Sequence, residues 1–152
     1  MTDFNCLTTL DNVFLSESVS QSGKPYYKVD IAISSVQPFL QVLEPALGHS
    51  KFAQISQCKQ QRDGKEFHVT VISPEEKITL TKQDLARPFG LELLGIGMVS
   101  SEVYYIVVRA DALNSLRKRY GLEASDFHIT LGFMDKDIHG VSKGISTLFL
   151  SL

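Results

Sequence analysis

Residues 66–71 read Glu-Phe-His-Val-Thr-Val and residues 126–131 read Asp-Phe-His-Ile-Thr-Leu, so one pattern of residue types occurs twice in the chain. Each stretch alternates polar and apolar residues with a period of two, which is typical of a β-strand with one buried face. Because side chains two residues apart point to the same side of a strand, His and Thr share one face in each stretch. The opposite faces are apolar and suit a protein core.

The sequence around these two stretches repeats as well. Residues 26–31 and residues 103–108 each read as an earlier strand, and each is followed by apolar residues at helical spacing. The chain therefore contains two strand-helix-strand units, over residues 26–72 and 93–133. We predict that residues 1–152 form a single domain with a pseudo-two-fold arrangement, in which the equivalent strands of the two units lie close together.

Patterns elsewhere in the chain predict the remaining elements. We expect strands over 12–19, 52–60, 93–99, 102–109 and 145–152, helices over 36–47 and 111–120, a hairpin-type turn at 62–65 and polar loops over 20–25 and 135–144. Residues 77–91 give no clear pattern, because Pro88 and Gly90 argue against a long helix there.

The duplicated His-x-Thr sequence indicates a chemistry. Cleavage of a phosphoester beside a ribose hydroxyl needs one group that takes a proton and another that gives one. Two histidines can share these tasks near neutral pH, because the ordinary imidazole pKa is about 6.5. We predict that His68 and His128 are the acid and base, and that the hydroxyls of Thr70 and Thr130 bind the phosphate oxygens. One such sequence is a weak signal, but two in matched strands are far more specific.

The mechanism requires no metal ion or other cofactor. The sequence contains no His-x-x-x-His or Cys-x-x-Cys spacing typical of a zinc site.

Residues 67–71 and 127–133 resemble the twin signatures of the 2H phosphoesterase superfamily. This resemblance implies an α+β fold of two lobes, each an antiparallel sheet with a helix, with the motifs facing each other across a central cleft. It also implies a metal-independent phosphodiesterase that cleaves a 2′,3′-cyclic phosphate or a 2′- or 3′-linked oligonucleotide bond. Residues 137–141 are similar to branches likened to RNA-repair proteins, and other members cut cyclic oligonucleotide signals.

Six further residues are candidates for binding the rest of the substrate, and each has an alternative role. Lys136 and His139 follow the second motif and could contact a phosphate or base, or belong to a solvated loop. Aromatic side chains could stack on a base or pack in the core, and strand parity places Phe133 on the core face. The full set of candidates is Lys24, Tyr27, Tyr105, Phe133, Lys136 and His139.

The composition and net charge of the chain limit the kinds of partner that we expect it to bind. The chain has 152 residues and a formal net charge of -2, with a pI of about 6.1, whereas proteins that bind long nucleic acids are usually basic. We therefore expect a nucleotide or short oligonucleotide as substrate, and no long duplex. No apolar run is long enough for a membrane span, and residues 1–6 do not resemble a secretory signal. We expect a cytoplasmic monomer with Cys6 and Cys58 reduced.

Three other functions fit the same sequence. The first keeps the chemistry but acts on a cyclic di- or oligonucleotide messenger. The second is a nucleotide-binding module that retains the cleft without catalysis. The third is a structural or interaction protein whose polar strand faces pair in its interior. The presence of all four motif residues argues against a decayed, non-catalytic site.

Overall fold

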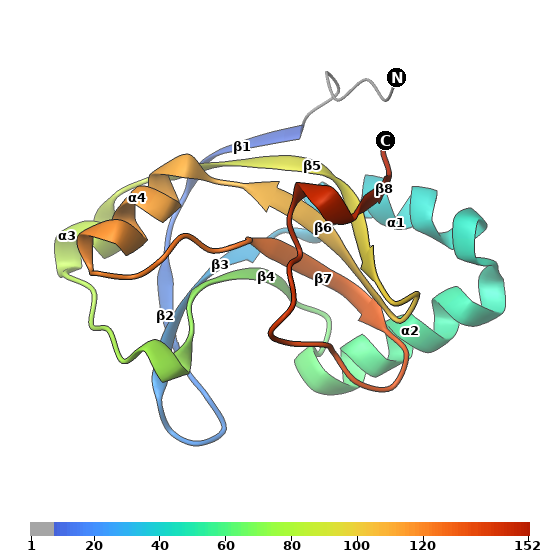
Figure 1. Ribbon diagram of the computed structural model, residues 1–152, viewed down its shortest axis with the longest axis horizontal. Coiled ribbons are helices and arrows are strands. Elements are labelled where there is room, and N and C mark those ends of the chain that lie inside the picture. The colour runs from blue at the N-terminus through green and yellow to red at the C-terminus, as the bar shows by residue number, and fades with distance from the viewer. Residues whose placement is uncertain (1–7) are drawn as a thin grey trace.

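The computed structural model describes residues 8–152, which form an eight-stranded antiparallel sheet with four helices (Figure 1). The strands are β1 (Thr8–Val13), β2 (Ser16–Val19), β3 (Pro25–Ile31), β4 (Phe67–Ile72), β5 (Phe89–Val99), β6 (Val103–Arg109), β7 (His128–Phe133) and β8 (Leu148–Leu150). The helices are α1 (Ile33–Leu47), α2 (His49–Asp63), α3 (Lys82–Ala86) and α4 (Asp111–Arg119), with short 3-10 turns η1 (Pro74–Glu76) and η2 (Ile145–Thr147). The expected α+β class is confirmed.

The sheet is strongly curved. Its strand order is β1-β5-β6-β7-β4-β3-β2, with β8 also pairing with β5. Only Phe14 and Leu15 separate β1 from β2, although these strands lie at opposite ends of the order. A two-residue bend therefore connects the strands at the two ends of the sheet (Figure 1). The strand expected over 12–19 is divided by this bend between β1 and β2. Leu15 at the bend is buried in the main core.

The main core lies on one face of the central strands. Val69 and Val71 of β4 and Ile129 and Leu131 of β7 are buried there, as their alternation predicted. The helices complete this core with α1 residues Val36, Phe39 and Leu43, α2 residue Ile55 and α4 residues Leu113 and Leu116. Burial of these apolar faces fixes which way the strands present their polar faces.

The two motif strands are neighbours at the centre of the sheet. β4 and β7 pair antiparallel, with Val69 opposite Ile129. Each also pairs antiparallel with the first strand of its own repeat unit, and in both cases the register shifts directly after the motif threonine. The sheet is continuous through both units, while the pseudo-two-fold relation between two whole lobes stays a prediction.

Helix α2 replaces the strand predicted over 52–60 and the hairpin turn predicted at 62–65. Ile55 and Lys59 are buried one helical turn apart. The sequence shows this periodicity only weakly, because the segment is short and largely polar. Gly64, with a φ of 69°, ends the helix instead of forming a hairpin. The helix packs closely on β7, because a Cβ at Gly132 would lie 2.8 Å from the carbonyl oxygen of Ile55.

Two predictions about cysteines and location have partial answers. Cys58 is partly buried and forms no disulfide within residues 8–152, whereas Cys6 lies outside the described residues, so the reduced state of both stays a prediction. Within residues 8–152, no helix is long and apolar enough to cross a membrane. The cytoplasmic location stays a prediction.

Candidate active site

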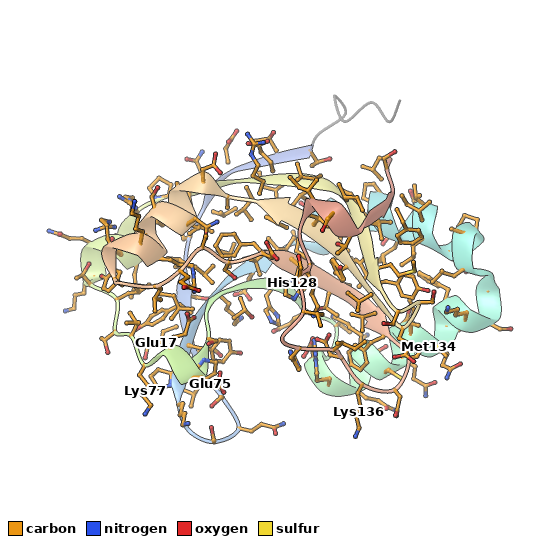
Figure 2. The ribbon with its side chains drawn as sticks, in the orientation of Figure 1. Glu17, Glu75, Lys77, His128, Met134 and Lys136 are labelled. Carbon is orange, nitrogen blue, oxygen red and sulfur yellow. The ribbon has the colours of Figure 1, made fainter. Side chains whose placement is uncertain are left out.

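Both His-x-Thr motifs line one pocket of about 770 Å³ on the polar face of β4 and β7. This volume is within the range of small-molecule sites. Figure 2 shows His128 at the centre, above the space between η1 and the loop that follows β7. The lining residues are Ser20, Tyr26, Arg62, Asp63, His68, Thr70, Val71, Ser73, Pro74, Glu75, Glu76, Arg117, Ser125, Asp126, His128, Thr130, Asp137 and His139.

The strand register sets the spacing of the four motif side chains. Because Val69 pairs with Ile129 antiparallel, His68 lies opposite Thr130 and Thr70 lies opposite His128. Side chains directly opposite each other have Cβ atoms about 5 Å apart, and diagonal neighbours such as the two histidines about 7–8 Å. Two imidazoles at this separation, with a hydroxyl beside each, can surround one tetrahedral phosphate.

The outer strands surround the two histidines differently. On β3, Lys28 lies opposite Thr70 and Asp30 lies opposite His68, and these two side chains form an ion pair. On β6, the corresponding positions are Tyr105 opposite Thr130 and Val107 opposite His128. His68 therefore has the charged side chains of β3 beside it, whereas His128 has Tyr105 and Val107 of β6 beside it.

His128 is held as a neutral imidazole. Its Nδ1–H donates to the backbone oxygen of Asp126 at 3.1 Å, because a carbonyl can only accept, so in the neutral ring the lone pair is on Nε2. The Tyr105 ring meets the imidazole edge-on, with centroids 5.6 Å apart. Burial lowers the pKa of His128 to about 4, and the nearby ammonium of Lys143 acts in the same direction. At neutral pH, His128 can therefore accept a proton through Nε2.

The environment of His68 is more mixed. Burial lowers the pKa of its imidazole, while the carboxylate of Asp63 acts in the opposite direction. Lys28 and Arg62 disfavour the protonated form, and Asp30 favours it. The structure thus distinguishes two histidines that the sequence repeat makes nearly equivalent.

A network of charges, from the exposed Arg62 to the buried Lys143, forms the wall beside His128. At the end of α2, Arg62 donates to Asp63 and, at 2.6 Å, to Asp137 in the loop after β7. Lys143 donates to the other oxygen of Asp137 at 3.1 Å, and the side chains of both residues are about 5% exposed. The network fixes the loop, which has no regular hydrogen bonding of its own, against α2.

Arg117 of α4 supports the pocket from behind. Its guanidinium donates to the carbonyl of Val71 at 2.7 Å, to both oxygens of Glu76 and to the carbonyl of Glu123. Val71 is the residue at which the β3–β4 register shifts, directly after Thr70. Arg117 is thus occupied in holding the strand beside the motif threonine, although it also lines the pocket.

Of the six candidate substrate contacts, the structure brings only His139 into the pocket lining. Lys24 and Lys136 are exposed and lie outside the lining. Tyr27 is buried in the core, where its hydroxyl accepts from the Leu80 amide at 3.1 Å, and the preceding Tyr26 lines the pocket instead. The prediction of Tyr27 as a base contact is corrected on this point, because strand alternation turns it toward the core.

The two remaining candidates lie behind the pocket. Tyr105 is buried beneath His128, and its hydroxyl donates to Thr147 at 2.8 Å. Phe133 is buried under the guanidinium of Arg62, 4.8 Å from the ring centroid. The predicted core face of Phe133 is wrong, because the register shift after Thr130 reverses the alternation and moves the ring into a second cluster with Tyr105.

Sequence patterns missed most of the charged pocket residues. The sequence patterns place Arg62 and Asp63 in a hairpin turn and Arg117 in a helix over 111–120, with no indication that these residues line a pocket. The only available signal was the cluster of charges just before Gly64, and no pattern linked it to Asp137. Among residues 8–152, no group of three or more His, Cys, Asp or Glu side chains is arranged to hold a metal ion.

Comparison with protein families matches residues 31–139 to the family described as 2H-SAK: Swiss Army Knife, 2H phosphoesterase domain. The chain belongs to this 2H phosphoesterase family, since the match spans more than half of its 152 residues. The family indicates an enzyme with a phosphodiesterase-type function, and the resemblance inferred from the twin motifs is confirmed. No curated protein and no solved structure matches the chain.

Proposed function

We propose that the protein is a metal-independent phosphodiesterase that hydrolyses a 2′,3′-cyclic phosphate, or a 2′- or 3′-linked oligonucleotide bond, by two-histidine acid-base catalysis. The observation that carries this proposal is that His68, Thr70, His128 and Thr130 line a single pocket from two neighbouring strands. Membership of the 2H phosphoesterases supports the reaction class. The predicted partner is a nucleotide or short oligonucleotide.

The proposed roles follow from the difference between the two histidines. His128 acts as the base, because its Nδ1–H is bound to the Asp126 carbonyl and its Nε2 carries the lone pair. Burial and the charge of Lys143 keep it unprotonated. His68 acts as the acid, because the carboxylates of Asp63 and Asp30 oppose the lowering of its pKa by burial, whereas His128 has the charge of Lys143 beside it. The reaction needs one neutral and one protonated imidazole, so it proceeds through the fraction of the enzyme in which His68 is protonated and His128 is not.

For a cyclic phosphate, a water molecule attacks phosphorus while Nε2 of His128 takes its proton. The bond between phosphorus and one ribose oxygen breaks, and His68 gives its proton to that oxygen. Thr70 and Thr130 donate their hydroxyl hydrogens to the non-bridging oxygens as charge grows there. The product is a nucleoside monophosphate with one free ribose hydroxyl, and proton exchange with solvent restores both histidines.

A substrate panel with product mapping tests the proposal. Nucleoside 2′,3′-cyclic phosphates, RNA ending in a cyclic phosphate, 2′-5′-linked oligoadenylates and cyclic di- and trinucleotides are incubated with the enzyme in excess EDTA. Chromatography and mass spectrometry then identify the products. We expect hydrolysis of a cyclic phosphate or linear 2′ or 3′ bond that EDTA does not inhibit. Cleavage of cyclic oligonucleotides alone would favour the messenger-hydrolase alternative instead.

Variants connect the activity with the motifs. His68→Ala and His128→Ala should each abolish turnover, whereas His49→Ala removes an exposed histidine outside the pocket lining and should not affect it. Nucleotide binding without any product would support the non-catalytic module. Inhibition by EDTA that zinc reverses would reject the metal-independent mechanism.

A further inference from the structure

The positive charges around the pocket are all neutralised by neighbouring carboxylates. Among the described lining residues, the two cationic side chains are Arg62 and Arg117. Arg62 pairs with Asp63 at 2.7 Å and with Asp137 at 2.6 Å, and Arg117 pairs with Glu76 at 2.7 Å. The charge of each guanidinium is therefore already balanced by a carboxylate.

The two lysines that act on the histidines are paired in the same way. Lys28, whose charge is felt by His68, pairs with Asp30. Lys143, whose charge is felt by His128, pairs with Asp137 at 3.1 Å. The cations beside and beneath the motif residues are thus balanced by carboxylates within a few ångströms.

Two lining carboxylates have no cationic partner among the described residues. Glu75 is exposed on η1, and Asp126 precedes β7 and accepts a hydrogen bond from the hydroxyl of Ser142 at 2.9 Å. Figure 2 shows Glu75 across the pocket from the loop that carries Lys136. With the four cations balanced by four carboxylates, these two further carboxylates give the pocket a net negative charge apart from its histidines.

This balance matches a substrate with one negative charge. In the proposed reaction, the proton on the acid His68 is the single positive charge that no carboxylate of the lining pairs with, and a phosphodiester carries one negative charge. A second phosphate on the same substrate would find no unpaired cation in the lining and would face Glu75 or Asp126. Repulsion between like charges in a partly enclosed cleft is stronger than in water.

We propose that the pocket selects phosphodiesters that carry a single negative charge, and that Glu75 disfavours substrates bearing further phosphates. This inference rests on the proposed function and narrows its substrate class to cyclic phosphates and linked nucleosides that carry a single phosphodiester and no other phosphate. Oligonucleotides with cyclic ends then become poorer substrates than mononucleotides.

The experiment compares adenosine 2′,3′-cyclic phosphate with the same molecule carrying a 5′-phosphate. The added group brings up to about two further negative charges at neutral pH. At low ionic strength, we expect kcat/KM for the 5′-phosphorylated compound to be roughly tenfold lower, equivalent to about 1.4 kcal/mol. The ratio should shrink as salt screens the repulsion. Calorimetry on the same protein measures the binding of both compounds independently of turnover.

Charge variants locate the effect. Glu75→Gln and Glu75→Lys should progressively reduce the ratio by improving kcat/KM for the 5′-phosphorylated compound. Glu102→Gln is a matched control, because Glu102 is also exposed but lies in the β5–β6 turn outside the pocket lining. Equal or better kcat/KM with the 5′-phosphate at low salt, or a ratio unchanged in Glu75→Lys, would overturn the inference.

The proposed function and this inference fail in different ways. Absence of turnover with both compounds would reject hydrolysis of a 2′,3′-cyclic phosphate, while the ratio of their dissociation constants would still report the charge preference. Turnover of both without preference would reject only the charge preference. Lys136 and Lys77, which are exposed outside the lining, would produce the opposite preference if they captured the second phosphate.

Discussion

Acidification should destabilise the protein through His128. The pKa of this imidazole is about 4 in the folded chain and about 6.5 when unfolded, so the unfolded chain binds the proton more tightly. The stability that depends on neutral His128 is therefore present above pH 6.5 and is lost as the pH falls toward 4. One pKa unit corresponds to about 1.4 kcal/mol, so the loss between pH 7.5 and pH 4.5 should reach roughly 2–3 kcal/mol.

Urea unfolding at the two pH values measures this loss in wild type and in His128→Gln. The variant lacks the titrating group. Between pH 7.5 and pH 4.5 its free energy of unfolding should therefore fall by roughly 2–3 kcal/mol less than that of wild type. Carboxylates such as Asp137, whose pKa is lowered by its hydrogen bonds from Arg62 and Lys143, titrate in both proteins. Their contribution to the free energy of unfolding therefore cancels in the difference between wild type and His128→Gln. His49→Gln, at an exposed histidine, should retain the wild-type pH dependence. Identical pH dependence in wild type and His128→Gln would refute the buried, neutral imidazole.

Three further outcomes follow from the site and its supports. The kcat/KM profile should rise through a pKa of about 4 for the base and fall through a second pKa below 6.5 for the acid, as a pH series on a cyclic phosphate will measure. Gly132→Ala should cost about 1–3 kcal/mol in urea unfolding by pushing α2 from β7, whereas Gly90→Ala, with ordinary contacts at 3.7 Å or more, should cost little. Arg117→Met should lower the free energy of unfolding by at least about 2 kcal/mol, because it leaves buried hydrogen-bonding groups unpaired. The control Arg109→Met, at an exposed arginine, should lower it by less than about 1 kcal/mol. Equal losses in the two variants would contradict the support role of Arg117.

The central strands and their polar faces could be predicted because period-two alternation is a local property. Burial of Val69 and Ile129 leaves their motif neighbours on the other face, as the alternation requires. Helix α2 could not be predicted, because its few apolar positions fit a strand as well as a helix. Its helical state depends on packing against Gly132, which is distant in the sequence.

The register shifts explain the errors near the ends of the motif strands. Alternation predicts the correct face up to Thr130 and the wrong one for Phe133, because one extra residue in β7 reverses the side chains beyond it. Bulges of this kind depend on the partner strand and leave no clear pattern in a single sequence.

The charged residues around the two histidines also could not be predicted from local sequence patterns. Lys143 and Asp63 act on different histidines from segments far apart in the chain, and only the fold brings them there. The repeat made the histidines look equivalent, whereas the unrelated residues around them give the two imidazoles different electrostatic surroundings.

The central claim is that the two histidines act together on one phosphate. Turnover of a 2′,3′-cyclic nucleotide by His68→Ala, His128→Ala and the double variant tests it most directly, with circular dichroism confirming that each variant folds. General acid or base catalysis contributes about 10²–10⁴-fold, so each single variant should lose at least about 100-fold in kcat. The account predicts that the double variant is only slightly slower than the worse single one, because either loss already disables the pair. Wild-type turnover in either single variant, or losses that multiply in the double, would contradict it.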